Sequence, residues 1–211
     1  MPDGTLELQR LGGEVGERHF PVLAEWILDA GNPHLQWLSL DDRGHALGVI
    51  AASLASVRSE LWAGHVTALI EGGEAIGGFV ALPSDDLPDR RKADLTQLIR
   101  ATDREQRAEL RRRVELGKTA YLPVEPRQLF LSKFGLLASH RGRGLGSSLL
   151  DAFIASAWLE GFNTIRLDVN RANTPAVRLY ESRGFRPIGR TTLAVVGVEY
   201  LAMILERDGH A

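Results

Sequence analysis

Apolar residues recur with two different spacings in the first part of the chain, and the spacing predicts which segments are helices and which are strands. Between residues 18 and 30 the apolar side chains share one helical face, and residues 44–62 repeat that spacing. The segments 65–71 and 75–82 instead look like strands, and Gly72-Gly73 between them predicts a β-hairpin. An alternating segment at 5–10 adds one more strand.

From residue 127 onward the pattern predicts a strand, a helix, a strand, a helix and two more strands. Thr174-Pro175, a capping hydroxyl followed by proline, predicts the start of the second helix, and Gly184 its end. Gly135 predicts a bulge or a close backbone approach in the first strand. The strands are expected at 128–137, 164–169, 185–195 and 198–206, and the first helix at 144–160. This order predicts a mixed α/β sheet flanked by helices, with residues 1–211 as one domain.

The segment from about 84 to 120 differs from the rest because it is rich in charges of both signs and poor in apolar residues. Its few apolar positions have helical spacing, so we expect one or two helices inserted into the domain. A charge-rich helix is typical of a solvated face, whereas a lid over a substrate or a dimer contact is the alternative. The sequence leaves the role of this insertion open.

Composition and charge exclude several classes of function. The 211 residues carry a formal net charge of only -2, which gives no argument for nucleic acid or membrane as partner. The absence of cysteine excludes disulfides, thiolate metal sites and cysteine nucleophiles, and the six scattered histidines lack metal-ligand spacing, so no metal is expected. The first residues do not resemble a secretory signal, and no apolar run reaches the roughly 18 residues of a membrane span. A cytoplasmic location is therefore predicted.

The segment with the most chemical content is a glycine-rich loop between a predicted strand and a predicted helix. It runs through Arg141, Gly142, Arg143, Gly144, Leu145, Gly146 and Ser147. Glycines allow successive backbone N–H groups to face one concavity, and the following helix adds unpaired N–H groups and the positive end of its dipole. Such a loop predicts a phosphate site. The spacing matches neither a P-loop nor the dinucleotide fingerprint, although Asp168 keeps the second alternative open.

Three motifs in the right order resemble those of the GNAT family of N-acetyltransferases. Residues 141–146 are similar to its Q/R-x-x-G-x-G/A signature, and a strand ends five residues before them. Residues 173–185 are similar to its pattern N-x-x-A-x-x-x-Y-x-x-x-G-F. The resemblance is close over 128–206 and weak over 1–127. It implies a mixed, mostly antiparallel sheet that splays at a cofactor cleft, with 127–206 as the cofactor-binding half.

The resemblance also implies roles for individual residues. The pyrophosphate of acetyl-coenzyme A (acetyl-CoA) is expected on the loop from Arg141 to Ser147, and its pantetheine arm along the backbone of Phe134, Gly135 and Leu136. A main-chain N–H near Leu136 would stabilise the developing oxyanion. Asn173 would contact the cofactor, with a helix cap as the alternative. Tyr180 would protonate the departing thiolate, with a packed core tyrosine as the alternative.

The predicted activity is transfer of an acetyl group from acetyl-CoA to a primary amine by direct attack, through a tetrahedral intermediate. Some family members use a glutamate as base on the strand before the loop, but this chain has Ser132 and Lys133 there. The base is left open among Glu71, Glu74, Asp168, Glu199 and His65. The acceptor, a small-molecule or a protein amine, is also left open, as is a homodimer. The alternatives are a non-catalytic acyl-CoA sensor and a transferase that uses another acyl donor.

Overall fold

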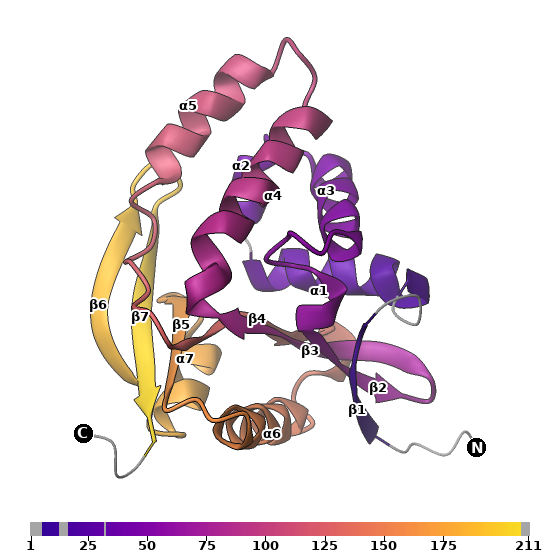
Figure 1. The fold of residues 1–211 in the computed structure, drawn as a ribbon, viewed down its shortest axis with the longest axis vertical. Helices are drawn as coiled ribbons and strands as arrows, with labels where there is room; N and C mark the ends of the chain where they lie inside the picture. The colour runs from indigo at the N-terminus through magenta and orange to yellow at the C-terminus, as the bar shows by residue number, and fades with distance from the viewer. Residues whose placement is uncertain (1–5, 13–16, 32, 208–211) are drawn as a thin grey trace.

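The computed structural model describes residues 6–12, 17–31 and 33–207, which form one open, twisted sheet with helices on both faces (Figure 1). The seven strands lie in the order β1-β2-β3-β4-β5-β7-β6. All neighbours are antiparallel except β4 and β5, so the mixed and mostly antiparallel sheet expected from the sequence is confirmed.

The helices and strands follow the predicted order closely. The strands are β1 (Leu6–Arg10), β2 (Val66–Glu71), β3 (Glu74–Pro83), β4 (Leu129–Leu136), β5 (Thr164–Asn170), β6 (Arg186–Leu193) and β7 (Val198–Glu206). The α-helices are α1 (Phe20–Gly31), α2 (His34–Leu38), α3 (Arg43–Ala55), α4 (Leu87–Ala101), α5 (Arg107–Gly117), α6 (Leu145–Leu159) and α7 (Thr174–Glu181). Short 3-10 turns are η2 (Ala63–His65), η3 (Ser84–Asp86) and η4 (Ala138–His140). No helix within the described ranges is long and apolar enough to cross a bilayer.

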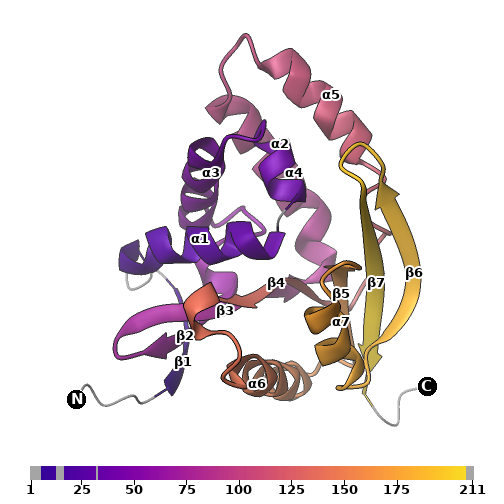
Figure 2. The same cartoon turned by 180° about the vertical axis from the view of Figure 1, so that it is seen from behind.

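Two hydrophobic clusters hold the helices on opposite faces of the sheet. In the first, α1 and α3 pack through residues such as Trp26 and Leu54 against Val66 and Val80 of the β2–β3 hairpin. In the second, Phe153 of α6 lies among side chains of β3, β4, β5 and α7, and its ring contacts that of Phe79. Figure 2 shows α6 and α7 on the side of the sheet away from α1 and α3. Both faces of β3 are therefore buried over most of its length, which explains why the residues from Ala75 to Leu82 are apolar or glycine.

The parallel pair β4–β5 is the shortest contact in the sheet. Only three residues on each strand pair, from Leu129 opposite Ile165 to Leu131 opposite Leu167, although both strands continue beyond that point. The two strands therefore diverge after Leu131 and Leu167, which is the splayed sheet that the sequence resemblance implied.

The charged insertion forms α4 and α5. In Figures 1 and 2, α4 rises away from the sheet and α5 returns to the turn that joins β6 and β7. There the segment after α5 joins a small core in which Ala120 and Trp37 pack with Leu193 and Tyr200. The insertion therefore bridges one end of the sheet and the helices above it.

Three local predictions are corrected by the structure. The helix expected over 44–62 ends at Ala55, and α2 was not predicted. The cap of α7 is Asn173, not Thr174, because the Asn173 side chain accepts a hydrogen bond from Ala176 N–H at 3.3 Å. The bulge in β4 falls at Ser132, which has no opposite residue on β3, whereas Gly135 pairs regularly with Gly78.

Candidate active site

The loop before α6 presents a row of unpaired backbone donors. The five consecutive N–H groups from Gly142 to Gly146 have no hydrogen-bond acceptor among the described residues. Gly142 and Gly144 have φ values of 77° and 78°, a left-handed conformation that glycine adopts without strain. A Cβ at either position would meet nothing within 4 Å, so the space beside the loop is open. This geometry suits an anion, since the loop and the first turn of α6 direct positive partial charge to one place.

The two arginines of the loop hold it in position. Arg141 Nε donates to the carbonyl oxygen of Leu136 at 2.9 Å, which ties the loop to the end of β4. Arg143 forms a two-pronged ion pair with Glu71 at the end of β2, and His140 lies 3.5 Å from the same carboxylate. The Arg143 guanidinium is therefore paired with the protein, whereas Arg141 is tied to β4 through Nε alone.

The divergence of β4 and β5 exposes main-chain groups of β4 to the cleft. Leu137 N–H donates to Ile76 of β3 at 2.8 Å, so it points toward β3. Successive N–H groups of a strand point to opposite sides, so the N–H of Leu136 faces away from β3 and toward the gap left by β5. The N–H of Phe134, two residues earlier, points to the same side as that of Leu136, whereas the N–H of Gly135 points toward β3. The N–H groups of Phe134 and Leu136 therefore face the gap between the strands, and that of Gly135 does not.

Two glycines on β3 let the end of β4 lie close. A Cβ on Gly77 would stand 2.4 Å from the carbonyl oxygen of Gly135 and 2.7 Å from the Cα of Leu136. A Cβ on Gly78 would stand 2.2 Å from the carbonyl oxygen of Thr67. Gly135 itself has room, because its Cβ would meet only Ala30 at 3.8 Å. The backbones of β3 and β4 do lie close at Gly135, but the residues that must lack a side chain there are Gly77 and Gly78 on β3.

Tyr180 lies at the wall of the cleft on α7. Its side chain is buried, with its ring against those of Phe134 and Phe185. Burial raises the pKa of its phenol above the ordinary value, so the hydroxyl stays protonated at neutral pH. The hydroxyl has no hydrogen-bond partner within the described ranges. A neutral phenol with a free O–H can donate a proton to a group in the cleft.

A cavity of about 700 Å³ opens from the cleft toward the helices. Tyr180 and Asn173 line one end, together with Phe134 of β4 and Asn170 of β5. The other end is lined by α1, α2, α3 and the insertion, which contributes Arg91, Asp94, Leu95 and Leu98 from α4. The insertion is therefore part of this cavity and not only a solvated face. Its volume is in the range typical of small-molecule sites.

Glu60 organises the charges at the far end of the cavity. Its carboxylate accepts a hydrogen bond from Arg91 Nε at 3.0 Å and another from the Ser132 hydroxyl, and lies 3.8 Å from Lys133 Nζ. The bulge at Ser132 lets these two consecutive side chains of β4 reach the same carboxylate. Burial alone would raise the pKa of Glu60, but Arg91, Lys133 and Ser132 outweigh it and lower the pKa to about 2. Glu60 is therefore a permanent anion with poor basicity.

Two other carboxylates in the cavity are stronger bases. Burial raises the pKa of Asp94 to about 6, and it also raises that of Asp168, against the opposing effect of Arg166. Asp94 accepts a hydrogen bond from Glu60 N–H at 2.9 Å and Asp168 one from Arg166 at 2.8 Å. Each keeps one oxygen, Oδ1 of Asp94 and Oδ2 of Asp168, with no partner in the part of the chain that the structure describes.

Of the five bases considered from the sequence, only Asp168 lines the cavity. Glu71 is paired with Arg143, and Glu199 lies within reach of Arg171 and Arg190. His65 is bonded to the carbonyl oxygen of Glu60, and Glu74 is exposed at the hairpin end of β3. Of these five candidates, Asp168 is therefore the one placed to act on a molecule in the cavity.

Comparison with known proteins identifies the family. Residues 6–185 match the model of the acetyltransferase (GNAT) family. The chain belongs to the GNAT acetyltransferase family. Membership of this family implies transfer of an acetyl group from acetyl-CoA. No curated protein matches the chain by sequence.

Solved structures agree with a GNAT fold over the whole chain. An N-acetyltransferase from Staphylococcus aureus Mu50 has a TM-score of 0.69 at 15% identity, covering 94% of this chain and 100% of that one. Another acetyltransferase has a TM-score of 0.65 at 21% identity, with 96% and 100% covered. A chain of the NatC complex bound to Gag peptide and CoA has a TM-score of 0.54 at 15% identity, with 95% and 98% covered. At these identities the likeness concerns the fold.

The candidate site combines residues that the GNAT motifs predicted with residues that only the structure brings to the cavity. Phe134 of β4, Asn173 and Tyr180 line the cavity, and the loop follows the end of β4, to which Arg141 ties it. The Asn173 side chain caps α7, which confirms the cap interpretation, and the residue also lines the cavity. Glu60, Arg91 and Asp94 were missed, because no local pattern in the sequence links them. No group of three or more potential metal ligands occurs among the described residues.

Proposed function

We propose that this GNAT protein is an N-acetyltransferase that moves the acetyl group of acetyl-CoA to a primary amine by direct attack. The observation that carries the proposal is the row of five unpaired N–H groups, Gly142 to Gly146, beside a cleft that leads into a cavity of about 700 Å³. The loop suits a diphosphate, and the cavity suits the acceptor. The homodimer and the cytoplasmic location stay predictions from the sequence.

The residues of the cleft fit an extended thioester between β4 and β5. The backbone of Phe134 and Leu136 would pair with the pantetheine arm, and Leu136 N–H would donate to the thioester oxygen as negative charge develops there. Gly135, with its N–H turned toward β3, would shape the strand without contacting the arm. Arg141, Leu145 and Ser147 belong to the same loop and first helical turn, and Asn173 would stand near the thioester end.

The chemical step needs two proton transfers, for which the cavity offers two groups. The amine nitrogen forms a bond to the carbonyl carbon, and the C–S bond breaks. Asp168 would accept the proton that the amine loses, and Tyr180 would give a proton to the departing thiolate. The absence of cysteine agrees with a reaction that needs no covalent enzyme intermediate.

Replacing Asp168 with asparagine is expected to lower kcat/KM about 10- to 100-fold. Asparagine keeps the shape and can still accept from Arg166, but it cannot take a proton. In the wild type the carboxylate is the active form, so activity falls as the pH drops below the pKa of Asp168. That acidic limb should be absent from the pH–rate profile of the variant. Wild-type rates in Asp168→Asn, beside the exposed control Asp151→Asn, would remove Asp168 from the mechanism.

Replacing Gly144 with aspartate is expected to weaken coenzyme A binding by at least about 10-fold, because it places a carboxylate against the phosphates. Asparagine is the matched control, since asparagine and aspartate both tolerate the left-handed conformation and differ in charge. Isothermal titration calorimetry with coenzyme A measures both variants. Equal affinities of Gly144→Asp and Gly144→Asn would contradict the phosphate assignment of the loop.

The activity itself is tested by thiol release from acetyl-CoA across a panel of primary amines. Release that depends on the amine, with N-acetylated product detected by mass spectrometry, supports the transferase. Tight binding of acetyl-CoA without release for any amine would favour the sensor. Faster release from propionyl-CoA or succinyl-CoA than from acetyl-CoA would favour another acyl donor.

A further inference from the structure

The lining of the whole cavity carries charges of both signs. It contains four carboxylates and three cationic side chains, namely Asp29, Glu60, Asp94, Asp168, Arg91, Lys118 and Lys133. A site for a polyamine would need a clear excess of carboxylates, because each ammonium requires a counter-charge when it leaves water. The near balance of charges instead suits an acceptor that carries both signs.

Among the three cations, Arg91 is the one whose charged group is held in place by the protein and still has unpaired donors within the described ranges. Lys133 Nζ is held by the carbonyl and hydroxyl oxygens of Ser132 and by Glu60, and Lys118 is paired with Glu115. Arg91 uses only Nε, toward Glu60, and its two Nη groups have no acceptor among the described residues. Its side chain is still 39% exposed although it lines the cavity.

The position of Arg91 is fixed before any ligand arrives. Its guanidinium carbon lies 5.1 Å from the ring centre of Phe130 and 5.9 Å from that of Tyr121. These cation–π contacts and the bond to Glu60 hold the planar group, so little conformational freedom is lost when its outer edge binds an anion. A guanidinium edge matches the two oxygens of a carboxylate.

We propose that the acceptor is a small amine that also bears a carboxylate, and that Arg91 binds this carboxylate through its Nη groups. The inference rests on the proposed N-acetyltransferase activity and narrows its substrate class. The outer edge of the Arg91 guanidinium, with both Nη groups unpaired among the described residues, matches the two oxygens of one carboxylate. Asp94 and Asp168 line the same cavity, and their carboxylates suit the amine end of such a molecule.

The experiment compares two matched series of acceptors, free amino acids and the corresponding amino acid amides, which differ only in the carboxylate. Wild-type kcat/KM is expected to be at least about 10-fold higher for the best acids than for their amides. In Arg91→Gln, kcat/KM for those acids should fall about 10- to 100-fold, mainly through KM, while that for the amides stays within about threefold. Arg91→Lys should keep part of the preference, because it keeps the charge without the fork.

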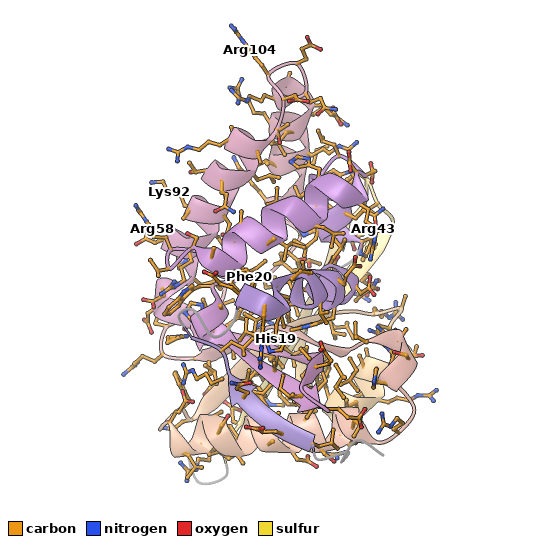
Figure 3. The ribbon with its side chains drawn as sticks, turned by 90° about the vertical axis from the view of Figure 1, so that its right-hand side faces the viewer. His19, Phe20, Arg43, Arg58, Lys92 and Arg104 are labelled. Atoms are coloured by element: carbon orange, nitrogen blue, oxygen red, sulfur yellow. The ribbon has the colours of Figure 1, made fainter. Side chains whose placement is uncertain are left out.

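Lys92→Gln is the control, because it removes one positive charge from the same helix outside the cavity. Lys92 is exposed and stands at the outer surface in Figure 3. This control should keep the acid preference of the wild type. The decisive quantity is the ratio of kcat/KM for the acids to kcat/KM for the amides, because a folding defect lowers both values by the same factor. An Arg91→Gln variant with the wild-type ratio would overturn the assignment of Arg91.

The outcomes separate this inference from the proposed function. Transfer to amides or to polyamines at rates equal to or above those of the acids would leave the acetyltransferase standing and overturn the carboxylate inference. No transfer to any amine by a wild-type protein that binds acetyl-CoA would overturn both.

Discussion

Replacing Glu60 with alanine is expected to lower the free energy of unfolding by about 3–5 kcal/mol, because it leaves two cations in the cavity wall without their shared counter-ion. Lys133 is the more affected of the two, since its side chain is only 13% exposed. Burial already lowers the pKa of Lys133, and Glu60 is the main opposing influence. Urea unfolding at pH 7, followed by fluorescence or circular dichroism, measures the difference.

Two comparisons make this result specific. Glu115→Ala removes an exposed partner of Lys118 and should change the free energy of unfolding by less than about 0.5 kcal/mol. Glu60→Gln keeps an acceptor for Ser132 and removes only the charge, so its loss should fall between the two. A Glu60→Ala loss as small as that of Glu115→Ala would show that the cluster contributes no stability.

The pH dependence gives a second check on Glu60. Its pKa is about 2 in the folded protein and has an ordinary value of 4.5, so the folded state binds its proton less readily than the unfolded state. The stabilisation from the carboxylate is therefore fully present above pH 4.5 and is lost as the pH falls toward 2. The gap in stability between the wild type and Glu60→Gln should narrow over that window.

The half of the fold that we propose binds the cofactor, residues 127–206, could be predicted from the sequence because its signals are local. Glycines at 142 and 144 must adopt the left-handed conformation, and both do. The loop joins a strand directly to a helix, so the direction of its amides follows from the elements on either side. Tyr180 and Asn173 lie on the next helix, within the same β-α-β-α run.

The acceptor end could not be predicted because its contacts join distant parts of the chain. Glu60 meets Arg91 across 31 positions and Ser132 across 72. The spacing of Val57 and Leu61 extended the predicted helix over Glu60, yet Val57 is 63% exposed. The Ser59 hydroxyl accepts from Leu61 N–H, which favours a turn over a helix. A buried carboxylate in a turn leaves no periodic signal.

The charged insertion is a second case in which the sequence pattern does not show which residues line the cavity. Its charges predicted a solvated surface, and most of α4 and α5 is polar and exposed as expected. Two of those charges, Arg91 and Asp94, lie one helical turn apart on α4 and line the cavity. Only the placement of α4 above the sheet distinguishes them from neighbours such as Lys92.

Replacing Tyr180 with phenylalanine is expected to lower kcat by about 10²- to 10⁴-fold, the range typical of a lost general acid. The ring contacts with Phe134 and Phe185 do not need the hydroxyl, so the fold and the affinity for coenzyme A should stay close to those of the wild type. Steady-state kinetics measures kcat, calorimetry measures the affinity for coenzyme A, and the thermal unfolding midpoint measures the stability of the fold. A variant with the wild-type kcat would remove Tyr180 from the mechanism.

The pH profile tests whether Tyr180 acts in its protonated form. Burial raises the pKa of its phenol, so Tyr180 stays protonated throughout the range in which the protein can be assayed. If it donates a proton, kcat should show no decline on the alkaline side up to about pH 10, the ordinary pKa of tyrosine. An alkaline limb that disappears in Tyr180→Phe would instead mean that the phenol titrates in the cleft. The position of Tyr180 beside Phe134, whose backbone faces the same gap between β4 and β5, suits the direct proton transfer to a thiolate that we propose.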